Sequence, residues 1–167
     1  MTTSLTITDR LNQPETVAQW QYKGYNCAVL LLDRPIPDEW EWQMNQSSHP
    51  DDSSFEYPRA VPTSTDWTRK PCYYTGYTQL PTVDDYAFTN APVYGGITYG
   101  PDNDGWIGFD TMHNQDIHKD ETGRVFEGSC FEFDHDPTGT AEVRVWTRDT
   151  VINETEKLVE WLVESHS

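Results

Sequence analysis

The spacing of apolar residues near the C-terminus predicts one amphipathic helix. From a start near Asp149 or Thr150, buriable side chains recur at intervals of three and four residues. An α-helix has about 3.6 residues per turn, so this interval places them on a single stripe. Either Asp149 or Thr150 can cap the first turn. The predicted stripe comprises Val151, Thr155, Leu158, Val159 and Leu162.

Shorter apolar runs earlier in the chain predict β-strands. Residues 20–33 have the pattern of a short strand, a turn at Gly24 and a buried strand that we expect to stop at Pro35 and Pro37. Residues 73–80 predict another strand. Two further strands, 93–99 and 106–110, are joined by a six-residue loop rich in Gly, Pro and Asp, which predicts a hairpin.

These elements indicate one α+β domain over residues 1–167: a small antiparallel β-sheet with a C-terminal amphipathic helix packed on one face. Residues 1–15 show little periodicity and are expected to be a flexible leader or an edge strand. Residues 45–54 contain no apolar anchor and are expected to be a polar loop insertion. Trp40 and Trp42 fit a helical turn or a strand equally well, and could form an adhesive apolar patch.

The charge of the chain points to its solvent. There are 28 Asp and Glu against 11 Lys and Arg, for a formal net charge of −17, and only four of the basic residues are Lys. A surface rich in carboxylates and poor in Lys is typical of halophilic proteins, because molar salt screens the repulsion between the carboxylates. Residues 59–80 are locally basic, and we expect them to neutralise neighbouring acids or to meet an anionic ligand.

Several functional classes are disfavoured by this composition. Direct binding to nucleic acid needs clustered Lys and Arg, whereas an acidic chain could instead mimic DNA. The longest aliphatic run, Ala28 to Leu32, is far shorter than the ~20 residues of a membrane span, and no signal peptide is evident. We therefore expect a cytoplasmic protein. Three widely spaced Cys imply neither a disulfide framework nor a structural zinc site.

Candidate chemistry is densest where the predicted hairpin ends. Asp110, His113 and Asp116 are spaced three apart after an apolar strand, so one turn would bring them to one side. Two carboxylates and an imidazole could ligate a divalent cation or act on a bound water. Equally, Asp110 could merely cap the following turn while His113 lies on the surface. These three residues are the candidate catalytic and metal-binding set.

A second candidate segment precedes them. Gly95 and Gly96 interrupt a strand pattern, which marks a bulge or a close approach of another group to the backbone. With Tyr94 and Thr98 they are the candidate ligand-binding residues.

At these positions the chain resembles a family of small uncharacterised proteins encoded by tailed phages and prophages. The matching motifs are Gly-Gly-Ile-Thr-Tyr at 95–99 and Gly-Phe-Asp at 108–110 followed by His113 and Asp116, with similar opening strands at 20–29. The family pattern has His where this chain has Tyr94. A Tyr, with an unperturbed pKa near ~10, cannot replace that His as a base at neutral pH.

The resemblance, together with the acidic composition, implies an accessory protein of a haloarchaeal virus or provirus. We expect it to bind a small ligand or a divalent cation at these segments and to act on host physiology or defence. Two alternatives stay open. One is a metal-assisted hydrolase that uses Asp110, His113 and Asp116, and the other is an acidic mimic of DNA that binds a host protein. The sequence leaves the oligomeric state open.

The charge balance predicts that the fold needs salt. On dialysis from molar KCl into dilute buffer the carboxylates are no longer screened, and we expect the melting temperature to fall. Circular dichroism melts over a KCl series provide the measurement. A melting temperature independent of KCl would contradict the halophilic interpretation.

Overall fold

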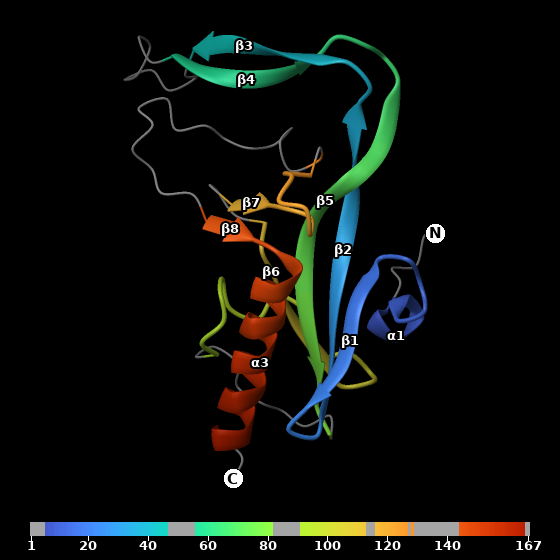
Figure 1. The fold of residues 1–167 in the computed structure, drawn as a ribbon, viewed down its shortest axis with the longest axis vertical. Coiled ribbons are helices and arrows are strands. Elements are labelled where there is room, and N and C mark those ends of the chain that lie inside the picture. The colour runs from blue at the N-terminus through green and yellow to red at the C-terminus, as the bar shows by residue number, and fades with distance from the viewer. Residues whose placement is uncertain are drawn as a thin grey trace. The chain divides into compact units, whose positions relative to one another are not determined.

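The computed structural model describes residues 6–46, 56–81, 91–112, 116–126, 128 and 144–165. Within these ranges the elements follow one another along the chain (Figure 1). They are α1 (Ile7–Arg10), β1 (Thr16–Tyr22), β2 (Tyr25–Pro37), β3 (Trp40–Gln46), β4 (Glu56–Pro62), β5 (Trp67–Gln79), β6 (Trp106–Asp110), β7 (Asp116–His118), β8 (Arg144–Trp146) and α3 (Arg148–Ser165).

Contacts between residues group the chain into two compact units. Unit 1 comprises Met1–Leu32, Tyr74–Met112 and Trp146–Ser167, and unit 2 comprises Asp33–Tyr73 and His113–Val145. The long strands β2 and β5 each contribute residues to both units. A single domain over residues 1–167 stays a prediction.

Unit 1 confirms the predicted fold class. An antiparallel sheet has the strand order β1-β2-β5-β6, and Figure 1 shows α3 running along one of its faces. The helix begins at Arg148, and its buried residues are those of the predicted stripe: Val151, Thr155, Leu158, Val159 and Leu162. Its cap differs by a few residues from the prediction, because Thr147 and Thr150 exchange hydrogen bonds across the first turn.

The helix lies close to the sheet at Gly76 of β5. A Cβ atom at Gly76 would lie 2.5 Å from the Thr155 hydroxyl oxygen and 2.7 Å from the Phe109 ring. Polar contacts hold the helix against β1, where the Trp20 indole donates to Glu156 and the Tyr22 hydroxyl donates to Glu160. The hydrogen bond from Tyr22, aided by Lys23, lowers the pKa of Glu160.

The opposite face of this sheet is covered as well. Ile7, Ala28, Leu30, Tyr77 and Trp106 form a buried cluster there. Four consecutive residues of β2, Cys27–Leu30, are fully buried because successive side chains of a strand point to opposite faces.

The N-terminal segment differs from the prediction of a leader. Residues 7–10 form α1, Thr6 and Asp9 make a reciprocal capping box, and Ile7 is buried in the core. A single buried apolar side chain is too short a pattern to predict a helix from sequence. Residues 1–5 lie outside the described residues.

The predicted turn between the first two strands is confirmed. Lys23 and Gly24 have φ values of 49° and 84°, a left-handed pair typical of a tight hairpin. The strand after it does not stop at Pro35: β2 continues to Pro37.

The predicted hairpin around residue 100 is shorter than expected. Val93 to Gly96 form a turn in place of a strand, and Tyr99 alone bridges to Gly108 of β6. Asp102 organises the loop, accepting hydrogen bonds from the backbone of Asp104 and Trp106 and from the Tyr99 hydroxyl. Burial and the Asp102 carboxylate raise the pKa of Tyr99 to about 12, so it remains a protonated donor.

In unit 2, β3 and β4 form a two-stranded antiparallel ribbon. Trp40 and Trp42 therefore belong to a strand. Asn45 and Gln46, expected at the start of a polar loop, are the last residues of β3, and 47–54 lie outside the described residues. Trp42 and Met44 alternate on one face of the ribbon and are 42% and 61% exposed.

The approach at Gly76 predicts a large effect of one methyl group. Gly76→Ala should lower the free energy of unfolding by about 1–3 kcal/mol, because Thr155 and Phe109 must move. Urea titration in molar KCl measures the change. Thr155→Ala in the same chain should recover part of the loss, and a purely additive double variant would contradict the contact.

Candidate functional site

Asp110 is the last residue of β6 and has a structural task. Its carboxylate accepts a hydrogen bond from the backbone N–H of Met112, 3.2 Å away, which stabilises the turn after the strand. The next residue, Thr111, is buried and donates to the carbonyl of Tyr74. The structure therefore contains the capping arrangement that was the simpler interpretation of Asp110.

Tyr94 is held against α3. Its backbone N–H donates to Glu154, and its ring packs on buried Trp146 with centroids 5.2 Å apart. Gly95 and Gly96 have φ values of 72° and 76°, which L side chains rarely adopt. A Cβ at Gly96 would meet no atom within 4 Å, so backbone conformation, and not a close approach, accounts for this glycine.

Tyr94 and Asp110 lie on different sides of the sheet. Asp110 pairs with Thr75, and Gly108 pairs with Tyr77, so these residues share the face opposite α3. Thr98 is exposed, and its backbone N–H donates to the Gly108 carbonyl. The structure does not bring Tyr94 and Asp110 together.

The remaining candidates are separated as well. His113 lies outside the described residues, and Asp116 belongs to unit 2 whereas Asp110 belongs to unit 1. Among the residues that the structure describes, no three His, Cys, Asp or Glu side chains gather as a metal site. The cation and catalytic roles of Asp110, His113 and Asp116 stay predictions.

Asp116 is nevertheless unusual in its burial. It is 5% exposed in β7, and His118, two residues on, is fully buried beside the Tyr73 ring. Both side chains point to one face of the strand, because residues two apart share a face. Asp116 and His118 are therefore part of the interior of unit 2.

The two described thiols are poor nucleophiles. Burial raises the pKa of Cys27 to about 11. Burial also raises the pKa of Cys72, although Arg34 opposes the shift. A thiol must ionise to attack an electrophile, so neither of these residues is suited to nucleophilic catalysis near neutral pH.

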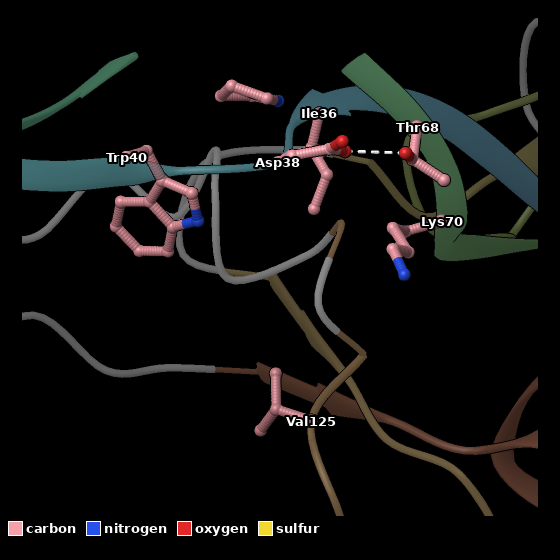
Figure 2. Close-up of a pocket in the computed structure, with 7 residues that line it drawn as sticks. Ile36, Asp38, Trp40, Thr68, Lys70 and Val125 are labelled. Carbon is pink, nitrogen blue, oxygen red and sulfur yellow. Dashed lines mark hydrogen bonds between the residues drawn. The ribbon is translucent and has the colours of Figure 1, made fainter. Parts of the chain in front are cut away.

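A cavity of about 570 Å³ in unit 2 is the most developed concave site (Figure 2). Its volume is within the range of small-molecule sites. It lies where the end of β2, the start of β3 and the first part of β5 meet the segment around Val125. Its lining comprises Ile36, Pro37, Asp38, Trp40, Thr68, Lys70 and Val125.

The polar rim of this cavity is tied together. The Thr68 hydroxyl donates to the Asp38 carboxylate, and the Asp38 N–H donates to the carbonyl of Asp66. Next to it, Arg69 forms an ion pair of 2.9 Å with Asp33. The exposed residues Arg69 and Asp33 neutralise each other, which is one of the two roles expected of the basic segment 59–80.

Trp40 and Lys70 supply the chemistry of the cavity. Figure 2 shows the Trp40 indole and the Lys70 ammonium bordering the same space, with Val125 on another side. The indole is held edge-on against Trp42, with centroids 5.1 Å apart. Val125 is positioned by its bridge to Lys119 and by the turn at Asp120, whose pKa is lowered by the Thr122 hydroxyl.

The sequence contained only part of the signal for this site. Trp40 was recognisable as a member of an apolar patch, and Lys70 as one of four Lys in an acidic chain. Ile36, Pro37 and Val125 are apolar residues without any distinguishing pattern. Their convergence depends on the tertiary structure, and no spacing rule could have predicted it.

Comparison of the chain with protein-family models, with curated proteins and with solved structures finds no match. The resemblance to phage and prophage proteins therefore stays a prediction. Among the described residues, no helix has the length and apolarity that a membrane crossing requires.

The role of Asp110 can be tested by two substitutions. Asp110→Asn keeps an oxygen for the Met112 N–H, so we expect the free energy of unfolding to change by less than about 0.5 kcal/mol. Asp110→Ala should lose about 1 kcal/mol, the usual cost of removing a cap. Urea titration and elemental analysis in molar KCl provide the readouts. Loss of a bound metal from a stable Asp110→Asn protein would show instead that Asp110 is a ligand.

Proposed function

We propose that this chain is a binding protein that takes a small organic ligand in the cavity of unit 2. The observation that supports this proposal is the cavity itself, about 570 Å³, with an indole and an ammonium among otherwise apolar and tied groups. Binding sites for small molecules are characteristically mostly apolar hollows with a few polar groups that fix orientation.

The proposal places the protein as a small-ligand-binding accessory factor of a halophilic virus or provirus, acting in the host cytoplasm. The viral setting comes from the motif resemblance at residues 94–116 and the halophilic setting from the net charge of −17. Compared with the sequence-based expectation, the ligand site moves from the segment around Gly95 to the cavity. The hydrolase and the DNA mimic stay alternative predictions.

Blocking the cavity should abolish binding without unfolding the protein. Val125→Phe places a ring in a space that Val125 borders, and Trp40→Ala removes the largest wall of that space. Saturation-transfer NMR with a mixture of small aromatic and aliphatic fragments in molar KCl reports which fragments bind. We expect both variants to weaken the bound fragments by at least about tenfold, a loss of ~1.4 kcal/mol.

Met44→Ala is the matched control, because Met44 lies on the same face of β3 and outside the cavity lining. It should bind the same fragments as the unaltered chain. Circular dichroism establishes that each variant is folded. If no fragment binds the unaltered chain, or if folded Val125→Phe binds as well as the control, the proposed function is wrong.

A further inference from the structure

The apolar part of the cavity is suited to a flat ring. The Trp40 indole is half-buried and held in one orientation by its edge contact with Trp42. Ile36 and Pro37 are buried, and Val125 borders the same space. A planar ligand gains both apolar burial and ring contacts on such a wall, which are worth more than the area alone.

The charged part of the cavity is suited to an anion. Lys70 is half-buried at the lining, so its ammonium is less hydrated than at an open surface. An ammonium has three donors, so an interaction with the protein leaves capacity for a ligand oxygen. Hydrogen bonds between an ammonium and an anionic oxygen are among the stronger ones in proteins.

From these two walls we propose that the ligand is a small planar ring bearing an anionic group, with the ring against Trp40 and the anion on Lys70. The inference rests on the proposed function, since it names the ligand class of the same cavity. A Lys ammonium acts as a point charge, so it accepts a carboxylate or a phosphate on the ring.

The net charge of −17 does not exclude an anionic ligand. In molar salt the Debye length is ~3 Å, so repulsion from distant carboxylates is screened. A direct contact with half-buried Lys70 is screened much less, because ions and water are partly excluded from it. Salt therefore favours the local attraction over the long-range repulsion.

Asp38 is the group that would favour a cation instead. Its carboxylate already accepts from Thr68, and its backbone is tied to Asp66, so it joins the end of β2 to the start of β5. It is also exposed, and a hydrated carboxylate attracts an amine weakly. Of the two opposite charges at the cavity, Lys70 is the less hydrated, and it determines the ligand's sign.

Four probes with one ring separate these possibilities. Indole-3-acetate and indoxyl phosphate carry an anion, 3-methylindole is neutral and tryptamine carries an amine. Isothermal titration in molar KCl compares them on the full chain. We expect at least one anionic probe to bind about ten- to a hundredfold more tightly than 3-methylindole, the scale of one charge-assisted hydrogen bond.

The variant Lys70→Met removes the ammonium and keeps the length of the side chain. It should abolish the preference for the anion and leave 3-methylindole within about twofold, because apolar contacts remain. Lys23→Met is the matched control: it changes the net charge equally, and Lys23 contacts Glu160 away from the cavity lining. It should keep the preference.

The outcomes distinguish the inference from the proposed function. Preferential binding of either anionic probe that Lys70→Met removes supports both, and the tighter probe identifies the anion. Tightest binding of tryptamine or of 3-methylindole, blocked by Val125→Phe, overturns the anionic class and retains the cavity. If no probe binds and the fragment mixture is also silent, both are overturned.

Discussion

The contact between Thr155 of α3 and Gly76 of β5 sets the distance on which unit 1 depends. Because β5 has no side chain there, the helix lies close enough for its whole apolar stripe to be buried. The same strand presents Tyr77 to the opposite face, where it joins the cluster containing Ile7. One glycine therefore allows a single sheet to be covered on both sides by a short chain.

Much of this arrangement could be predicted from the sequence because it follows from local periodicity. The helix stripe, the β1–β2 turn and β6 at 106–110 were each visible in spacing alone. What failed was decided by tertiary context. Ile7 nucleates a buried helix with no repeat around it, and the Gly-Gly segment forms a turn that only its contact with Glu154 makes ordered.

The candidate site shows the same division between local and distant information. Regular spacing of Asp110, His113 and Asp116 suggested one cluster, yet the chain enters a different unit between the first and the last of them. Residues that do border a cavity come from separate strands and carry no common motif. Local spacing can identify groups able to do chemistry, but the long-range pairing of strands decides which of them meet.

The perpendicular contact of Trp40 and Trp42 also has an optical consequence. Two indoles 5.1 Å apart at 85° have coupled electronic transitions, and such coupling depends on their mutual angle. Trp40 borders the cavity while Trp42 faces outward, so a shift of the inner ring alters the coupling without any change in secondary structure. The ribbon thus carries a built-in exciton reporter of the geometry of the cavity wall.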